Sequence, residues 1–342
     1  MRAQVAAEPA FRGAFLTGSA ADLPGSAPLP RSSDVDLTVL VAALSAAPVD
    51  RPTSGAVAGQ TTGAASRRRS GKQLVDGVLV DVSYLDEGAL ADPAWVAASF
   101  VYAPSFRGGQ VLADPTGHLG RLEAAIAPSF AAPAAVHART ADVHRRIRAR
   151  LTALDPHAAW ADLVLNWLFP TSLTAVARLV AALRMPTVRQ RYLRARAVTP
   201  PAEYEGLLAL LGCADATPGL VARHLDAVAE RFDEAAALLA ATAPSGGGPR
   251  LPFAADLTPA ARPVAIDGSR ELVDGGNHRE AVFWIVATAA RCQVALSTRA
   301  ADLAREHEPD FRRLVADLVG LHGPADLLTR RAALLATLPP PG

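Results

Sequence analysis

Apolar and polar residues follow two different periodicities along this chain. In the first part, short apolar runs rich in β-branched residues are typical of strands and occur at residues 14–17, 35–41, 73–76, 78–85 and 110–112. From about Pro133 onward, apolar positions recur instead at helical spacing, as at Val136, Val143, Ile147 and Leu151. The pattern therefore predicts an α+β protein in which strands and helices come first and an all-α bundle follows.

Local residues indicate where several helices of the second part begin or end. Thr217 precedes a proline and an apolar helical stripe, which predicts a helix start. Asn277 and Glu280 have the spacing of a capping box, with Asn277 as the N-cap. We expect two short helices around Pro170 and two last helices that open at Pro309 and Pro324.

Length and charge limit the class of protein. A chain of 342 residues exceeds one average domain. The change of pattern predicts a first domain over residues 1–130 and a helical domain over 131–342. The formal net charge is only +1, whereas proteins built to bind nucleic acid usually carry a strong basic excess. We therefore expect no nucleic-acid partner.

The cysteines and the apolar runs bear on the compartment. Cys213 and Cys292 stand far apart and make neither a disulfide framework nor a zinc pattern. Buried free thiols in a reducing cytoplasm are the expected state. The first residues lack the charged start and apolar run of a signal peptide. Since no run approaches ~18 uninterrupted apolar residues, we expect a cytoplasmic protein with no membrane partner.

Three aspartates stand in or beside the apolar runs of the first part. Asp34 and Asp36 are two residues apart at the start of one predicted strand, so both side chains project to the same face. Asp81 lies in the middle of a later apolar strand, where an acid is costly without a partner. If the two strands are neighbours, the three carboxylates form one cluster able to hold one or two Mg²⁺ ions, which prefer oxygen ligands.

A Gly18-Ser19 turn precedes these acids. The order of this turn, the aspartate pair Asp34 and Asp36, and Asp81 on a later strand resembles the nucleotidyltransferase superfamily with the polymerase-beta-like fold. Within it, the chain looks most like the aminoglycoside nucleotidyltransferase-like, small-molecule branch. The resemblance implies a mixed sheet flanked by helices, followed by a helical C-terminal domain that binds the substrate or has an accessory role. It also implies that Gly18 and Ser19 hold a triphosphate, that the aspartate pair ligates Mg²⁺, and that Asp81 completes the site.

The resemblance further implies a reaction. A nucleoside monophosphate would pass from an NTP, with ATP the expected donor, to a hydroxyl of a small molecule such as an aminoglycoside-like acceptor, and pyrophosphate would leave. Asp81 or a nearby acid would take the proton of the hydroxyl. The base of the nucleotide, the acceptor and the oligomeric state remain open.

Residues around the core motif offer further candidates. The basic run Arg67–Lys72 could reach the triphosphate, and Lys72 is its candidate nucleotide contact; a solvated loop is the alternative. Asp86 and Glu87 follow Asp81 closely and could bind a cationic substrate or act as a base, although carboxylates at a strand end are more often surface groups.

Three other functions compete with the small-molecule transferase. The same fold could adenylylate a protein, as antitoxin-like enzymes do. It could be a non-catalytic module that binds a nucleotide or a partner. It could also transfer to an RNA end, which the near-neutral charge disfavours.

Overall fold

A five-stranded sheet and a set of packed helices make up the computed structural model, which describes residues 10–23, 28–42, 71–242 and 251–340. By its internal contacts the chain divides into two units. The first comprises Met1–Arg146 and Leu179–Val188, and the second comprises Ile147–Arg178 and Arg189–Gly342. The division into functional domains expected at residue 130 stays a prediction.

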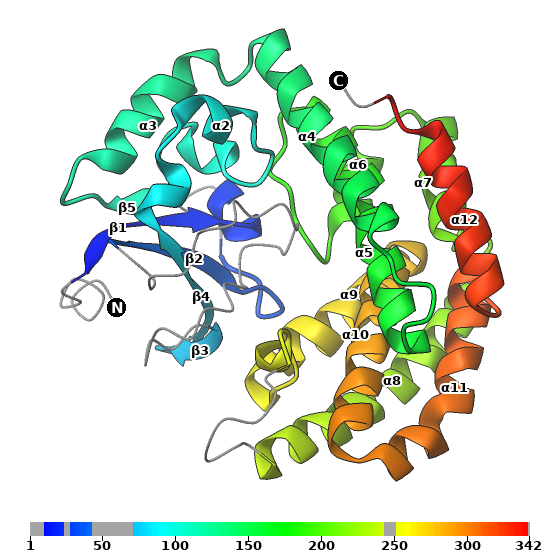
Figure 1. Ribbon diagram of the computed structural model, residues 1–342. Coiled ribbons are helices and arrows are strands. Elements are labelled where there is room, and N and C mark those ends of the chain that lie inside the picture. The colour runs from blue at the N-terminus through cyan, green and yellow to red at the C-terminus, as the bar shows by residue number, and fades with distance from the viewer. Residues whose placement is uncertain (1–9, 24–27, 43–70, 243–250, 341–342) are drawn as a thin grey trace. The chain divides into compact units, whose positions relative to one another are not determined.

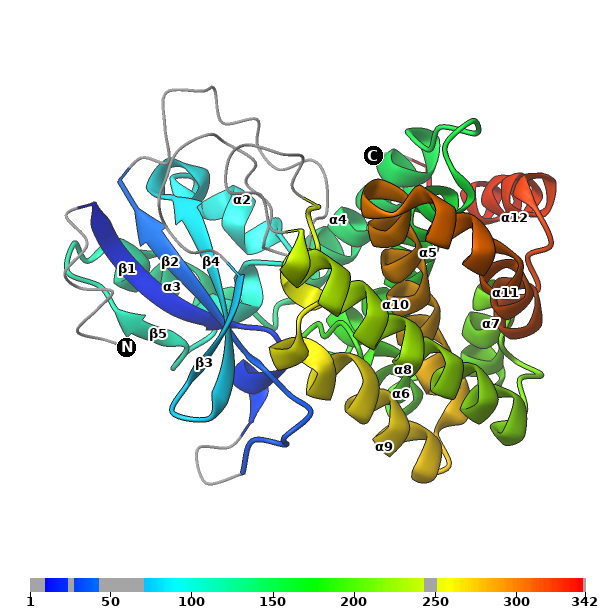
Figure 2. The same ribbon diagram turned by 90° about the horizontal axis from the view of Figure 1, so that it is seen from below.

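The first unit contains one mixed sheet, which confirms the α+β class (Figure 2). Its strands are β1 (Phe11–Thr17), β2 (Val35–Val41), β3 (Gly71–Val75), β4 (Val78–Asp86) and β5 (Val111–Ala113). They stand in the order β3-β4-β2-β1-β5. β2 and β4 run parallel, while the β3–β4, β1–β2 and β1–β5 pairs are antiparallel. β2 has the bounds that the apolar run predicts.

A tight hairpin joins β3 and β4. Its two turn residues, Asp76 and Gly77, both have positive φ, at 50° and 79°. Two consecutive left-handed residues are the signature of a type I′ turn, for which Asp-Gly is a preferred sequence. A two-residue turn fixes the register of both strands, and Val75 accordingly pairs with Val78.

The two faces of the sheet are both apolar but pack differently. On one face, buried side chains that include Leu37, Val39 and Val82 pack together as one cluster. On the other face, Leu40 and Leu85 join a cluster supplied largely by the segments after β4. These segments include α2 (Pro93–Ala98) and α3 (His118–Ile126), which lie beside the sheet in Figure 1.

The remaining helices follow without further strands in the described chain. They are α4 (Pro133–Thr152), α5 (Trp160–Ala181), α6 (Arg191–Arg196), α7 (Pro201–Leu211), α8 (Pro218–Ala241), α9 (Gly268–Asp274), α10 (His278–Arg299), α11 (Ala301–Val319) and α12 (Pro324–Thr337). α10 is buried over most of its length because α8, α9 and α11 pack around it. Thr217 caps α8 as expected, since its side chain accepts a hydrogen bond from the Leu220 N–H.

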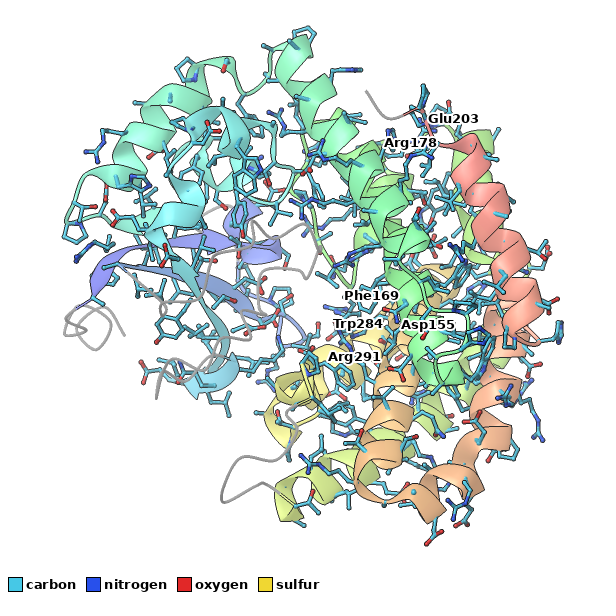
Figure 3. All side chains as sticks on the ribbon, viewed as in Figure 1. Asp155, Phe169, Arg178, Glu203, Trp284 and Arg291 are labelled. Atoms are coloured by element: carbon cyan, nitrogen blue, oxygen red, sulfur yellow. The ribbon has the colours of Figure 1, made fainter. Side chains whose placement is uncertain are left out.

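Aromatic rings fix one arginine of α10 in the second unit. The Arg291 guanidinium lies 5.3 Å from the ring centroid of Phe169 and 4.9 Å from that of Trp284 (Figure 3). It also pairs with Asp256 at 3.2 Å, and the ring of Phe253 lies 5.8 Å away. These contacts hold the irregular segment before α9 against α10.

The prediction that a helix opens at Pro324 is confirmed by α12, but the predictions for the other two prolines are wrong. α5 is one helix that continues through Pro170, and Pro309 lies inside α11 and does not open it. A proline in a helix interior removes one hydrogen bond and costs about 3 kcal/mol. In α11 the buried stripe continues on both sides of the proline, at Ala304 and Phe311. Burial of the apolar face therefore offsets the local cost.

The predicted capping box at the start of α10 does not form. Asn277 does stand at the N-cap of α10, but without a side-chain capping bond. The Glu280 carboxylate is buried and accepts hydrogen bonds from Arg196 and from the Tyr204 hydroxyl, each at 2.8 Å. A buried carboxylate needs such partners, and these come from helices distant in sequence.

Two helices of the described chain, α5 and α10, are long and apolar enough to cross a membrane by length and composition alone. Their most apolar windows are 67% and 78% buried inside the protein, respectively. Because the core helices of a globular protein pass the same test, this is weak evidence for a membrane span.

Candidate functional site

Strand geometry explains why the aspartates point the same way. Along β2, Leu37, Val39 and Val41 are buried on one face. Side chains alternate in a strand, so Asp36 points to the other face, together with Leu40. Asp34 immediately precedes the strand and shares this direction.

Asp36, Asp81 and Lys72 occupy one row across the sheet. Asp36 of β2 is the register partner of Asp81 on β4, and Asp81 is in turn the partner of Lys72 on β3. On the other side of β2, Thr17 of β1 pairs with Asp36. Paired residues project to the same face, so the fold itself brings these side chains together.

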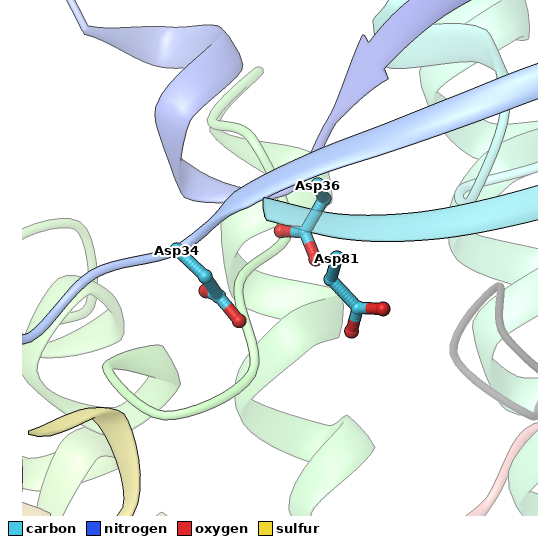
Figure 4. A group of neighbouring side chains, drawn as sticks. All are labelled: Asp34, Asp36 and Asp81. Carbon is cyan, nitrogen blue, oxygen red and sulfur yellow. The ribbon is translucent and has the colours of Figure 1, made fainter. Parts of the chain in front are cut away.

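The three carboxylates converge beside the start of β2. Asp34, Asp36 and Asp81 each offer an oxygen, and these oxygens lie within 4.8 Å of one another (Figure 4). All three residues are half-buried. Among the residues that the structure describes, this is the one group of three potential ligands drawn from His, Cys, Asp and Glu. Oxygen donors at this spacing suit a hard divalent cation such as Mg²⁺.

Lys72 already faces the cluster. Its ammonium donates to the Asp81 carboxylate at 3.0 Å and also to the Asp34 carboxylate. The lysine side chain is only 6% exposed, compared with 15% for Asp34 and 28% for Asp81. Lys72 was predicted to contact phosphate, and its pairing with two of the aspartates was not predicted.

Gly18 packs directly against Asp36. Its φ of 65° and ψ of −161° lie in a region that essentially only glycine adopts. A Cβ atom at this position would lie 2.7 Å from the Asp36 Cγ, closer than real Cβ atoms come to another carbon. The turn therefore touches the metal-ligand candidates, and it does so only because residue 18 is glycine.

Ser19 begins a short 3₁₀ turn, Ser19–Asp22, and two residues far along the chain, which the sequence did not single out, contact this turn. Arg107 forms an ion pair with Asp22. Gln110 donates a hydrogen bond to the Ala21 carbonyl at 3.4 Å. Neither contact has a local sequence signal, because the partners are far apart along the chain.

Other predicted candidates have separate roles or lie outside the described residues. Asp86 accepts a hydrogen bond from the Gly88 N–H at 2.8 Å, and Glu87 forms an ion pair with Arg12 at 3.5 Å. Both carboxylates therefore have other partners and are not part of the three-carboxylate group. The arginines of the basic run, residues 67–69, lie outside the described part of the chain.

No protein-family model, curated protein or solved structure matches the chain.

Proposed function

We propose that this protein is a Mg²⁺-dependent nucleotidyltransferase that passes a nucleoside monophosphate, with ATP the expected donor, to a hydroxyl of a small molecule. The observation that carries the proposal is the convergence of three carboxylate oxygens within 4.8 Å beside the start of the inner strand β2. The glycine turn against Asp36 is a second support, because a phosphate chain beside a metal needs close backbone approach.

In this proposal the chain's own residues bind and orient the reactants. Asp34, Asp36 and Asp81 would hold the metal, and bound Mg²⁺ would supply neutralisation of the triphosphate charge. Gly18 and Ser19 would contact the phosphates. The hydroxyl oxygen of the acceptor forms a bond to the α-phosphorus, the bond from that phosphorus to the bridging oxygen breaks, and pyrophosphate leaves. Asp81 or a nearby acid takes the hydroxyl proton. Because little covalent chemistry falls to the protein, positioning and charge stabilisation perform most of the catalysis.

The direct test is thermal stabilisation by each NTP, with and without Mg²⁺. A ligand at 100 times its Kd that binds only the folded state stabilises it by about 2.7 kcal/mol. We expect a shift that requires both Mg²⁺ and the aspartates and is lost in the Asp34→Asn/Asp36→Asn variant. Asp215→Asn, the same change at an exposed position, is the matched control and should keep the shift. Absence of any nucleotide shift in the unmodified protein would refute the proposal.

One observation favours a second candidate function. Since Lys72 neutralises part of the acidic cluster, the protein could be a non-catalytic module that binds a nucleotide without metal. Stabilisation by NTP that is independent of Mg²⁺, with no pyrophosphate released in an acceptor screen, would support this alternative.

A further inference from the structure

The position of Lys72 requires an explanation of its own. Its ammonium contacts Asp34 and Asp81, two of the three carboxylates. The side chain is 6% exposed, so most of its surface is removed from water. An ammonium is a compact and strongly hydrated charge, and burying it is costly unless partners compensate.

The three carboxylates, in turn, are stabilised by the Lys72 ammonium. Like charges at short distance disfavour ionisation of all members of a group unless an opposite charge lies among them. Asp34, Asp36 and Asp81 lie within one such distance. Lys72 supplies the opposite charge from within the chain, and no other lysine exists in the sequence.

A divalent metal would need the same oxygens. Oδ2 of Asp34 and Oδ2 of Asp81 are the atoms that accept from Lys72. A metal bound to both would repel an ammonium held at the same two atoms. The two cations therefore exclude each other from this position.

We propose that Lys72 is the built-in counter-ion of the metal-free site, and that metal binding displaces its ammonium, which then contacts the phosphates of the NTP. This inference rests on the proposed metal-dependent function. The lysine can move without moving the sheet, since it stands on the edge strand β3 and has a flexible four-carbon stem. The site would then exchange one cation for another and never hold three uncompensated carboxylates.

The first experiment measures metal affinity without nucleotide, by electron paramagnetic resonance of Mn²⁺. Lys72→Met keeps an unbranched, flexible side chain that is one atom shorter and removes the charge, whereas Lys72→Arg keeps the charge. We expect Lys72→Met to bind Mn²⁺ about tenfold more tightly than the unmodified protein, within the ~5–150-fold range common for coupled sites. Lys72→Arg should show no gain, and circular dichroism checks the fold of both variants.

The second experiment needs no variant and uses the fact that the sequence has one lysine. Protein grown with ¹³C-labelled lysine shows a single ε-methylene signal in a nuclear magnetic resonance spectrum. We expect this signal to be broad and restricted in the metal-free protein and to become sharp and mobile at saturating Mg²⁺. Addition of NTP should then restrict it again and change its chemical shift.

The outcomes separate this inference from the proposed function. One outcome is that the protein binds Mn²⁺, that Lys72→Met binds it no more tightly, and that the lysine signal does not change on addition of Mg²⁺. This outcome would overturn the counter-ion role and still support the metal site. If neither the unmodified protein nor Lys72→Met binds Mn²⁺, both proposals fail. A gain in affinity together with a mobilised signal supports the displacement.

Discussion

Replacing Gly18 by alanine tests the contact between the glycine turn and the acidic cluster. The added Cβ has two consequences. The backbone lies at φ 65° and ψ −161°, and holding another residue in such a region costs about 1–3 kcal/mol. The Cβ would also lie 2.7 Å from the Asp36 Cγ, and overpacking of this kind typically costs a further ~1–3 kcal/mol.

Asp36 is half-buried, so its side chain can turn away and relieve part of the clash. We therefore expect Gly18→Ala to lower the free energy of unfolding by about 2–4 kcal/mol, which is the lower half of the range given by the backbone cost and the overpacking cost together. The displaced carboxylate should also weaken Mn²⁺ binding. Urea unfolding followed by circular dichroism gives the free energy by linear extrapolation.

Gly77→Ala is the matched control. Gly77 also has positive φ, at 79°, but a Cβ there would meet nothing within 4 Å. Only the backbone cost of about 1–2 kcal/mol should remain. In an Asp36→Ala background, which removes the clashing carboxylate, Gly18→Ala should cost less than in the unmodified protein, with a coupling of about 1–2 kcal/mol. Equal costs for Gly18→Ala in both backgrounds would refute the contact.

Three further predictions concern single groups. Asp36→Asn should keep the far-ultraviolet circular dichroism spectrum and abolish Mg²⁺-dependent NTP stabilisation; unchanged NTP stabilisation would contradict its role. Glu280→Gln, which weakens a buried hydrogen-bonded carboxylate, should cost about 2 kcal/mol in urea unfolding, whereas Glu205→Gln, at the more exposed end of an arginine pair, should change the urea midpoint little. Burial raises the pKa of the Cys213 and Cys292 thiols to about 12. A raised pKa means that the folded state keeps its thiol protons longer, so stability should fall as pH rises from about 9 toward 12. The double cysteine-to-alanine variant should show a shallower loss in a series of melting curves.

Much of the sheet could be predicted because its signals are local. The apolar run of β2 and the Asp76-Gly77 turn define their elements within a few residues. The convergence of Asp36 with Asp81 was expected only if the two strands were neighbours, and the parallel register of β2 and β4 provides that. The role of Lys72 was missed, although a two-residue turn at Asp76 already places it opposite Asp81.

The remaining errors come from tertiary partners. Glu280 has the spacing of a cap, but Arg196 and Tyr204 bind its carboxylate from distant helices. Pro170 has the chemistry of a helix break, but the helix around it is largely buried. Burial and long-range hydrogen bonds outweighed the local preference in both cases.

The β3–β4 hairpin also bears on the order in which the sheet forms. Lys72 and Asp81 pair across one local hairpin, and such hairpins form in about 1–10 μs. The parallel pairing of β4 with β2 joins segments far apart in sequence, so it is intrinsically slower. We expect Asp81 to meet Lys72 before it reaches Asp36. When β4 docks onto β2, the Asp81 carboxylate would then already be paired with the Lys72 ammonium. This pairing lowers the electrostatic repulsion between Asp81 and Asp36 during docking.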